Sequence, residues 1–267
     1  FKLASFRNGS IAALIISMGE FGVIFALPLW LQNVEGLSAV SSGCVILWLA
    51  GGAFVASGAA GSMSGKVAPA VAVRFGVLLE LVGVLATAFA IGADAGWAWV
   101  CPGLFVYGIG VGFATAQLTG VIMIDVNPQQ AGQASGSQST ARQVGSAMGI
   151  AVIGTTLFTS TDSILHSKLD ALKLDPSFFS SSAKQGIVDA VVNSSGGAIP
   201  SLKEGLIAQS HAMLPVQTAT DIATAAGQAF SEGARWAAVS AALFLAIGLI
   251  STLRLGSKQH SEGSHHA

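Results

Sequence analysis

Six long apolar segments are the feature that most constrains how this chain can fold. They cover about residues 11–33, 39–62, 74–92, 98–124, 142–160 and 235–253. A bilayer core of about 30 Å requires about 20 apolar residues of helix. Only 9% of the residues are charged, against about 25% in soluble domains. The sequence therefore predicts an all-α integral membrane protein.

The composition also excludes several classes of function. Disorder requires low hydrophobicity and high charge, whereas the mean hydropathy here is +0.69. The formal net charge of −1 gives no basic surface for nucleic acid. Both cysteines, Cys44 and Cys101, lie in apolar runs and are expected to be free thiols. The chain has no zinc-protease motif, phosphate-binding loop or metal-spaced Cys/His set, so we expect no enzyme activity, cofactor or metal site.

The positive charges of the short connections predict an orientation in the membrane. With six spans they all fall on one side, which the positive-inside bias assigns to the cytoplasm. Both termini, including a tail at 254–267, are then cytoplasmic, and Lys66, Arg74 and Arg142 belong to cytoplasmic loops. The full set is Lys2, Arg7, Lys66, Arg74, Arg142, Arg254 and Lys258.

A polar insert at about 161–234 is predicted to lie on the opposite, extracytoplasmic side. Its lysines do not contradict this, since loops longer than about 60 residues largely escape the charge bias. Its composition suggests short helices and turns, with 221–236 leading helically into the last span. Trp97, Trp99 and Trp236 fall at the predicted outer boundary, where an aromatic belt is expected. A lid, a partner surface and a solvated cap all remain open as roles for the insert.

Two acidic residues lie inside predicted spans. An ionisable side chain at the bilayer centre costs about 2.5–3.5 kcal/mol on insertion scales, so it usually faces a cavity or a partner. Glu20 shares a helical face with Ser17, and Glu80 lies on a stripe of small and polar residues. Both are candidate proton carriers, because burial favours the neutral acid and can couple protonation to conformation. The alternative is that either one is a packed interhelical contact.

The fourth predicted span carries further polar candidates. Tyr107 and Gln117 share one helical face, and with Ser17 they are candidates to line a substrate cavity. Hydrogen bonding between helices is the alternative role. Glycine pairs spaced four residues apart let helices approach closely in lipid. We expect Gly108, Gly112, Gly145 and Gly149 to serve that packing.

The ordered set of these motifs resembles the major facilitator superfamily, specifically the fourteen-span drug:proton antiporters of the EmrB/QacA type. The resemblance covers essentially the whole chain. It rests on the run Pro28-Leu-Trp-Leu-Gln32 with Gly36, Ser38 and Gly43, on Gly108-Ile-Gly-Val-Gly112, on Ala131-Gly-Gln-Ala-Ser-Gly136 with Arg142, Gln143, Gly145 and Gly149, and on Phe230 to Arg235.

The resemblance implies the C-terminal six-helix half of such a transporter, with two inverted three-helix repeats. The chain starts at Phe1, so we expect a piece of a longer protein whose N-terminal half completes the substrate cavity. The implied function is proton-driven export of hydrophobic or cationic drugs across the plasma (inner) membrane by alternating access. The partners implied are a small-molecule substrate, protons, the lipid bilayer and that N-terminal half.

Two alternative functions remain open from the sequence. The same fold also suits a dedicated exporter of one natural product or metabolite. A truncated membrane module that transports nothing is the alternative from a different class.

Overall fold

The computed structural model describes residues 4–62, 67–92, 96–172, 180–209 and 215–253. Within these ranges the chain forms eight α-helices and no strand, which confirms the predicted all-α fold. Short 3-10 turns, η1 (Trp97–Trp99) and η2 (Pro128–Gln130), precede the fourth and fifth helices. The helices are α1 (Ala4–Asn33), α2 (Ala39–Ser62), α3 (Pro69–Gly92), α4 (Val100–Met123), α5 (Ala131–Ala171), α6 (Ser181–Asn193), α7 (Ile199–Gln209) and α8 (Val216–Thr252).

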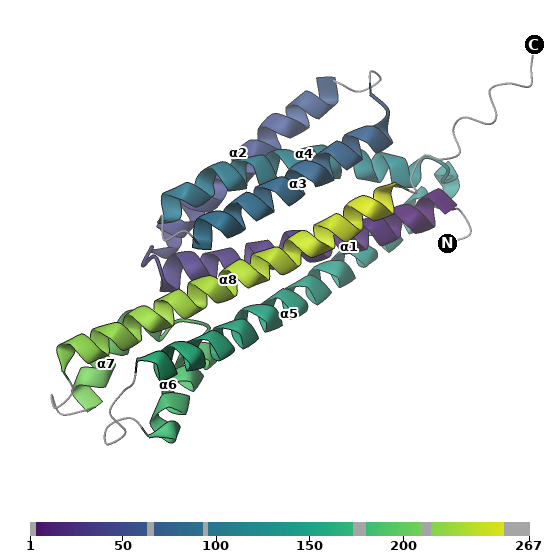
Figure 1. Cartoon of the computed structure of the whole chain (residues 1–267). Coiled ribbons are helices and arrows are strands. Elements are labelled where there is room, and N and C mark those ends of the chain that lie inside the picture. Colours follow the sequence, from purple (N-terminus) through teal and green to yellow (C-terminus); the bar gives the residue numbers. More distant parts are fainter. Residues whose placement is uncertain (1–3, 63–66, 93–95, 173–179, 210–214, 254–267) are drawn as a thin grey trace, which may run out of the picture.

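Six of the described helices, α1 to α5 and α8, are long and apolar enough to cross a membrane. They alternate in direction, so the start of α1 and the end of α8 lie at the same end of the bundle (Figure 1). At the opposite end, glycines lie in the connections that follow α1 and α3. Gly36 (φ +68°) and Gly96 (φ +83°) occupy left-handed conformations there, which glycine adopts without a steric penalty.

In chain order the six helices form two units of three, α1–α2–α3 and α4–α5–α8, and most contacts join a helix of one unit to a helix of the other. Helix α1 packs along α5 just as α4 packs along α2, and α1 contacts α8 just as α4 contacts α3. Corresponding helices of the two units run in opposite directions (Figure 1). This exchange of contacts is the pattern of two inverted three-helix repeats.

Glycines make the closest approaches between these helices. A Cβ atom added to Gly145 or Gly149 would collide with the α1 backbone at Leu14 or Met18. One added to Gly108 would collide with the carbonyl of Leu49 on α2, and one on Gly112 would lie 2.6 Å from the carbonyl of Ala53. All four glycines proposed for packing therefore lie at helix interfaces. By contrast, Gly132 and Gly136 at the start of α5 face open space.

Helices α5 and α8 extend well beyond the predicted spans 142–160 and 235–253. The 41 residues of α5 correspond to about 62 Å at about 1.5 Å per residue, twice the thickness of a bilayer core. The two helices project together past α1–α4, and α6 and α7 pack against the projecting end (Figure 1). Hydropathy detects only the apolar part of a helix. The polar turns on either side of that part belong to the same continuous helix.

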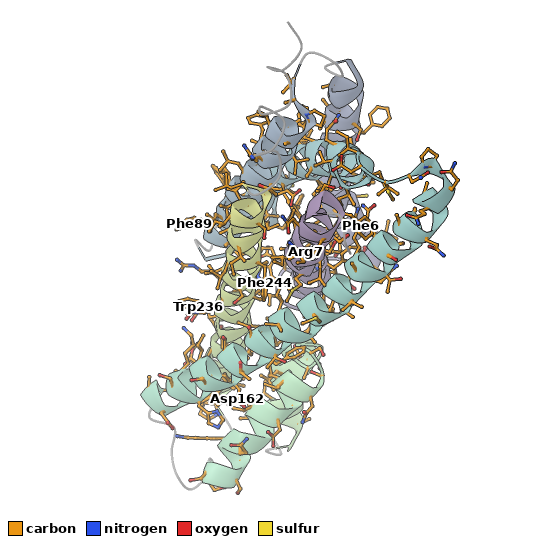
Figure 2. The ribbon with its side chains drawn as sticks, turned by 90° about the vertical axis from the view of Figure 1, so that its right-hand side faces the viewer. Phe6, Arg7, Phe89, Asp162, Trp236 and Phe244 are labelled. Atoms are coloured by element: carbon orange, nitrogen blue, oxygen red, sulfur yellow. The ribbon has the colours of Figure 1, made fainter. Side chains whose placement is uncertain are left out.

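The projecting end carries charge, whereas the sides of the bundle are apolar. Asp162 lies toward that end of α5, far from Phe6 and Arg7 near the start of α1 (Figure 2). Phe89 of α3 and Trp236 of α8 lie on the same outer side of the bundle (Figure 2). Large apolar side chains such as Val40 and Phe54, which are 78% and 83% exposed, cover the outside of α2. Such a surface suits contact with lipid or with another apolar partner.

Candidate functional site

Glu20 lies in the middle of α1 and forms a buried ion pair with Arg142 of α5. The distance from Arg142 Nη2 to Glu20 Oε2 is 3.5 Å. The side chain of Glu20 is 7% exposed and that of Arg142 is 30% exposed. The two residues come from different three-helix units, so this pair links the two repeats at their centre.

The position of Arg142 corrects its assignment to a cytoplasmic loop. Helix α5 begins at Ala131, eleven residues earlier. The loop before it ends at Asn127, whose side chain accepts a hydrogen bond from the backbone N–H of Gln129 (3.2 Å), and Pro128 opens the 3-10 turn. The polar segment after this turn is therefore already helical, and it carries Arg142 into the bundle. Arg142 shares a helical face with Gly145 and Gly149, which both pack on α1.

Arg74 also lies in a helix instead of a loop. It belongs to α3, and its guanidinium donates from Nε and Nη2 to the carbonyl of Thr252 at the end of α8, both at 3.3 Å. A further contact reaches the carbonyl of Leu253 at 3.4 Å. A cation at the C-terminus of a helix satisfies free carbonyls and complements the helix dipole. Lys66 lies outside the described residues.

Ser17 lies one turn before Glu20 and faces the same small cavity. This cavity has a volume of about 10 Å³ and is enclosed by residues of α1, α4 and α5, including Ser17, Glu20 and Arg142. The side chain of Ser17 is buried, and its hydroxyl has no hydrogen-bond partner. The volume corresponds to about one water molecule. Serine, carboxylate and guanidinium thus share a polar cell in an otherwise apolar bundle.

Tyr107 holds α4 against α1 beside this cell. It is completely buried, and its hydroxyl donates to the backbone carbonyl of Glu20 at 3.2 Å. Gln117 lies further along α4 and is partly exposed. The structure therefore brings Ser17 and Tyr107 close to Glu20, while Gln117 is not among the residues that line the cavity.

Glu80 of α3 is also buried, where α3 packs against Gly110 of α4. Its side chain is 0% exposed, and neither carboxylate oxygen has a hydrogen-bond partner in the described structure. Gly110 of α4 leaves the space that Glu80 occupies, since a Cβ there would collide with Glu80. Arg142 pairs with Glu20 and not with Glu80. The two acids thus differ in surroundings, one paired and one unpartnered.

Several buried polar residues are not predicted from the sequence, and Gln138 has the largest side chain among them. Gln138 of α5 is 5% exposed, and its amide donates to the hydroxyl of Thr119 on α4 at 3.2 Å. The signal was present in the sequence, because Gln138 and Arg142 are four residues apart and lie on one helical face. No group of three potential metal ligands occurs among the described residues.

The family of the chain follows from comparison with known proteins. A model of the Major Facilitator Superfamily matches residues 1–150, which include the first four spans and the first part of α5. These residues make up more than half of the chain and contain the whole Glu20–Arg142 cell. The chain belongs to the major facilitator superfamily of membrane transporters.

Several relatives carry names of drug or antibiotic transporters. Multidrug resistance protein Stp of Mycobacterium tuberculosis is 29% identical over 179 residues, 65% of this chain and 33% of Stp. The probable actinorhodin transporter of Streptomyces coelicolor is 32% identical over 59% of this chain and 28% of its own length. Drug efflux pump JefA of M. tuberculosis is 27% identical over 90% of this chain and 45% of JefA. The match thus spans less than half of each of these relatives.

Proposed function

We propose that this chain is the C-terminal half of a proton-coupled exporter of hydrophobic or cationic drugs, of the fourteen-span EmrB/QacA type. The names of the relatives support drug export. The share of those relatives that the match covers is compatible with one half of a larger transporter. The observation that carries the proposal is the ion pair between Glu20 and Arg142.

The pair couples protonation to the arrangement of α1 and α5. While Glu20 is ionised, its carboxylate holds Arg142 and ties the two three-helix units together. Removing one partner of a buried ion pair costs about 3–5 kcal/mol, because the other charge is left without compensation. A proton on Glu20 removes that partner, so the protonated protein favours an arrangement in which Arg142 reaches water or another acceptor. Substrate binding biases the same equilibrium through its differential affinity for the two states.

One such carboxylate is sufficient to drive export. A proton entering under about 150 mV supplies about 3.5 kcal/mol, at about 2.3 kcal/mol per 100 mV. This energy supports a substrate gradient of about 300-fold, at about 1.4 kcal/mol per factor of ten. Glu80 is the second candidate for proton exchange.

The remaining predicted roles complete the proposal. Ser17, Tyr107 and Gln117 are proposed to line the route of the substrate on the α1 and α4 side. We propose that the protein lies in the plasma (inner) membrane, with both termini in the cytoplasm and the 161–234 insert outside. The N-terminal half of the same transporter supplies the other wall of the substrate cavity.

Ethidium efflux from energised vesicles tests the proposal. The transporter is expressed from its complete coding region, and Glu20→Gln is compared with Glu204→Gln, which removes one exposed acid from α7. We expect a protonophore to stop efflux by the parent and by Glu204→Gln. Glu20→Gln should lose gradient-driven efflux and retain ethidium exchange without a gradient, at a normal level in the membrane. Efflux by Glu20→Gln equal to that of the parent would exclude Glu20 as the coupling residue.

A dedicated exporter of one natural product is the second candidate function. It is favoured by the relative named as a probable actinorhodin transporter. The same vesicles distinguish the two when they are loaded with a panel of aromatic natural products. Efflux of one such compound without efflux of ethidium would favour the dedicated exporter.

A further inference from the structure

A second cavity lies near the outer end of the bundle, away from Glu20. It has a volume of about 380 Å³ and opens between the ends of α1 and α3, the start of α7 and the first half of α8. Trp30 lines it from α1, ten residues beyond Glu20, which corresponds to about 15 Å along the helix. The cavity is within the size range of ligand sites, about 300–1,000 Å³. It is therefore separate from the small cell around Glu20.

Among the described residues, Glu35 is the only charged one that lines this cavity. It follows the end of α1 and is partly buried. Its Oε2 accepts a hydrogen bond from the backbone N–H of Trp97 at 3.1 Å, which leaves Oε1 available. No Lys, Arg or His in the described parts of the chain forms an ion pair with Glu35. The cavity thus has a carboxylate that no described basic residue pairs with.

The opposite wall, on α8, presents acceptor oxygens. The hydroxyls of Thr220 and Thr224 donate to carbonyls of their own helix, at 2.8 and 2.9 Å, so their lone pairs remain available to a ligand. The indole N–H of Trp30 is already used by Ser231 Oγ at 3.0 Å. Apolar groups, among them Ile91 of α3 and Ile199 of α7, complete the lining.

We propose that this cavity binds an organic ammonium group carried on an apolar body. The ammonium group of the ligand offsets the charge of Glu35 and faces the threonine oxygens. The apolar part of the ligand contacts Trp30, Ile91 and Ile199. An anion would meet Glu35 with no basic residue to compensate. The ammonium group comes either from a soluble amine or from the headgroup of a lipid. The class of ligand rests on the proposed function, which names cationic drugs, whereas the site itself depends neither on Glu20 nor on proton coupling.

Binding of benzyltrimethylammonium to the intact protein in nanodiscs tests this site. Isothermal titration compares the parent with Glu35→Gln, and Glu204→Gln serves as a matched loss of charge outside the cavity. Neutral benzyl alcohol is the control ligand. Because Glu35→Gln removes the charge opposite the cation, we expect it to weaken binding of the cation at least about tenfold. Glu204→Gln should not change it, and benzyl alcohol should bind far more weakly.

A second variant fills the cavity without touching its charge. The nearest atom to a Cβ at Gly227 is Val34 Cγ1 at 3.9 Å, so Gly227→Phe extends into the cavity and replaces a glycine inside α8. This variant should abolish binding of the cation. Binding that survives either Glu35→Gln or Gly227→Phe, or that does not exceed binding of benzyl alcohol, overturns the proposal. Ethidium efflux is measured in parallel, so that a loss of cation binding at this cavity is distinguished from a loss of transport.

The source of the ammonium group is resolved by the lipid of the nanodisc. Phosphatidylcholine and a glucosyl diacylglycerol are both neutral, and only the first carries an ammonium headgroup. Equal binding of benzyltrimethylammonium in the two lipids supports a soluble amine as the ligand. Weaker binding in phosphatidylcholine, seen in the parent and in Glu204→Gln, supports a lipid headgroup that competes for the cavity.

Discussion

The ion pair at the centre of the bundle and the one at its projecting end differ in how deeply their carboxylates are buried. Glu20 and Arg142 are 3.5 Å apart, with side chains 7% and 30% exposed. Lys168 and Glu232, which join α5 to α8 at the projecting end, are closer, at 3.0 Å, with side chains 28% and 45% exposed. The two cations are similarly exposed, so the carboxylates make the difference. Removal of Arg142 leaves a buried charge on Glu20, whereas water screens Glu232 when Lys168 is removed. Burial, and not distance, therefore determines which pair matters to the fold.

The same contrast occurs along the single helix α5. Its first turns carry Gly132 and Gly136 in open space, while Gly145 and Gly149 lie against the backbone of α1. A glycine weakens a helix by about 1 kcal/mol relative to alanine. At the start of α5 nothing offsets that weakness. In the middle of α5, the close contact with α1 requires glycine.

Removal of the central guanidinium should produce the largest effect. Arg142→Met leaves the carboxylate of Glu20 buried without a partner, for which we expect a loss of about 3–5 kcal/mol, reduced where Glu20 takes up a proton. Thermal unfolding in detergent measures the change. Arg7→Met, which removes an exposed arginine from the first turns of α1, should be nearly neutral.

The double variant Glu20→Gln/Arg142→Met sharpens this prediction. With both charges removed, no buried charge remains, and most of the lost stability should return. A double variant as unstable as Arg142→Met would show that Arg142 acts through packing and not through Glu20.

A matched pair of glycine substitutions on α5 should have the next largest effects, with opposite signs. Gly149→Ala introduces a methyl group where the backbone of Met18 already lies, so we expect a loss of about 1–3 kcal/mol. Gly136→Ala meets no atom within 4 Å and should gain up to about 1 kcal/mol. Thermal unfolding measures both variants. A gain at both positions would contradict the close packing of α1 on α5.

Much of the fold is predictable because the spans are defined by composition. The predicted ends at 33, 62 and 92 coincide with the ends of α1, α2 and α3. The starts of α1, α5 and α8 lie 7, 11 and 19 residues before the predicted starts at 11, 142 and 235. Hydropathy measures transfer into lipid, and a polar helical turn has no such signal.

The sequence predicts some residues of the candidate site, but it does not predict which of them contact one another. Glu20 stands out because a charge is rare in an apolar run. Its partner does not, because Arg142 is 122 positions away and their meeting depends on how α1 and α5 align. That alignment follows from Leu14 and Met18 facing Gly145 and Gly149, which a single sequence does not reveal. Hydropathy therefore assigns a polar residue that flanks a span, such as Arg142, to a loop.

At the projecting end, removal of a lysine should have only a small effect. Lys168 Nζ contacts Glu232 at 3.0 Å and donates to Gln228 at 3.3 Å. Exposed pairs of this kind contribute about 0–1 kcal/mol, so Lys168→Met should lower stability by less than about 1 kcal/mol. Lys203→Met on α7 is the control. A loss as large as that of Arg142→Met would remove the distinction between the two regions.

The smallest predicted effect concerns His166, in the part of α5 that projects beyond the predicted span 142–160. Its Nδ1 faces the carbonyl of Asp162 at 3.0 Å, and its Nε2 faces Gln185 Oε1 of α6 at 2.9 Å. The amide of Gln185 is held in this orientation because its Nε2 donates to Asp189 at 2.9 Å. A neutral imidazole has one N–H, so only the imidazolium donates to both oxygens. The hydrogen bond to Asp162, followed by the one to Gln185, raises the pKa of His166 above its ordinary value of 6.5.

The sign of the pH dependence follows from this raised pKa. A group whose pKa is higher in the folded state contributes its full stability below its ordinary pKa and loses it as the pH rises through the folded value. The contact between α5 and α6 should therefore be strongest below about pH 6.5 and weaken above it. Hydrogen exchange of the α6 amides, corrected for intrinsic rates, should show protection that falls as the pH rises. His166→Gln should remove the dependence, and α7 should show none in either protein. Protection that rises with pH in the parent would mean that the neutral imidazole, and not the imidazolium, makes the contact between α5 and α6.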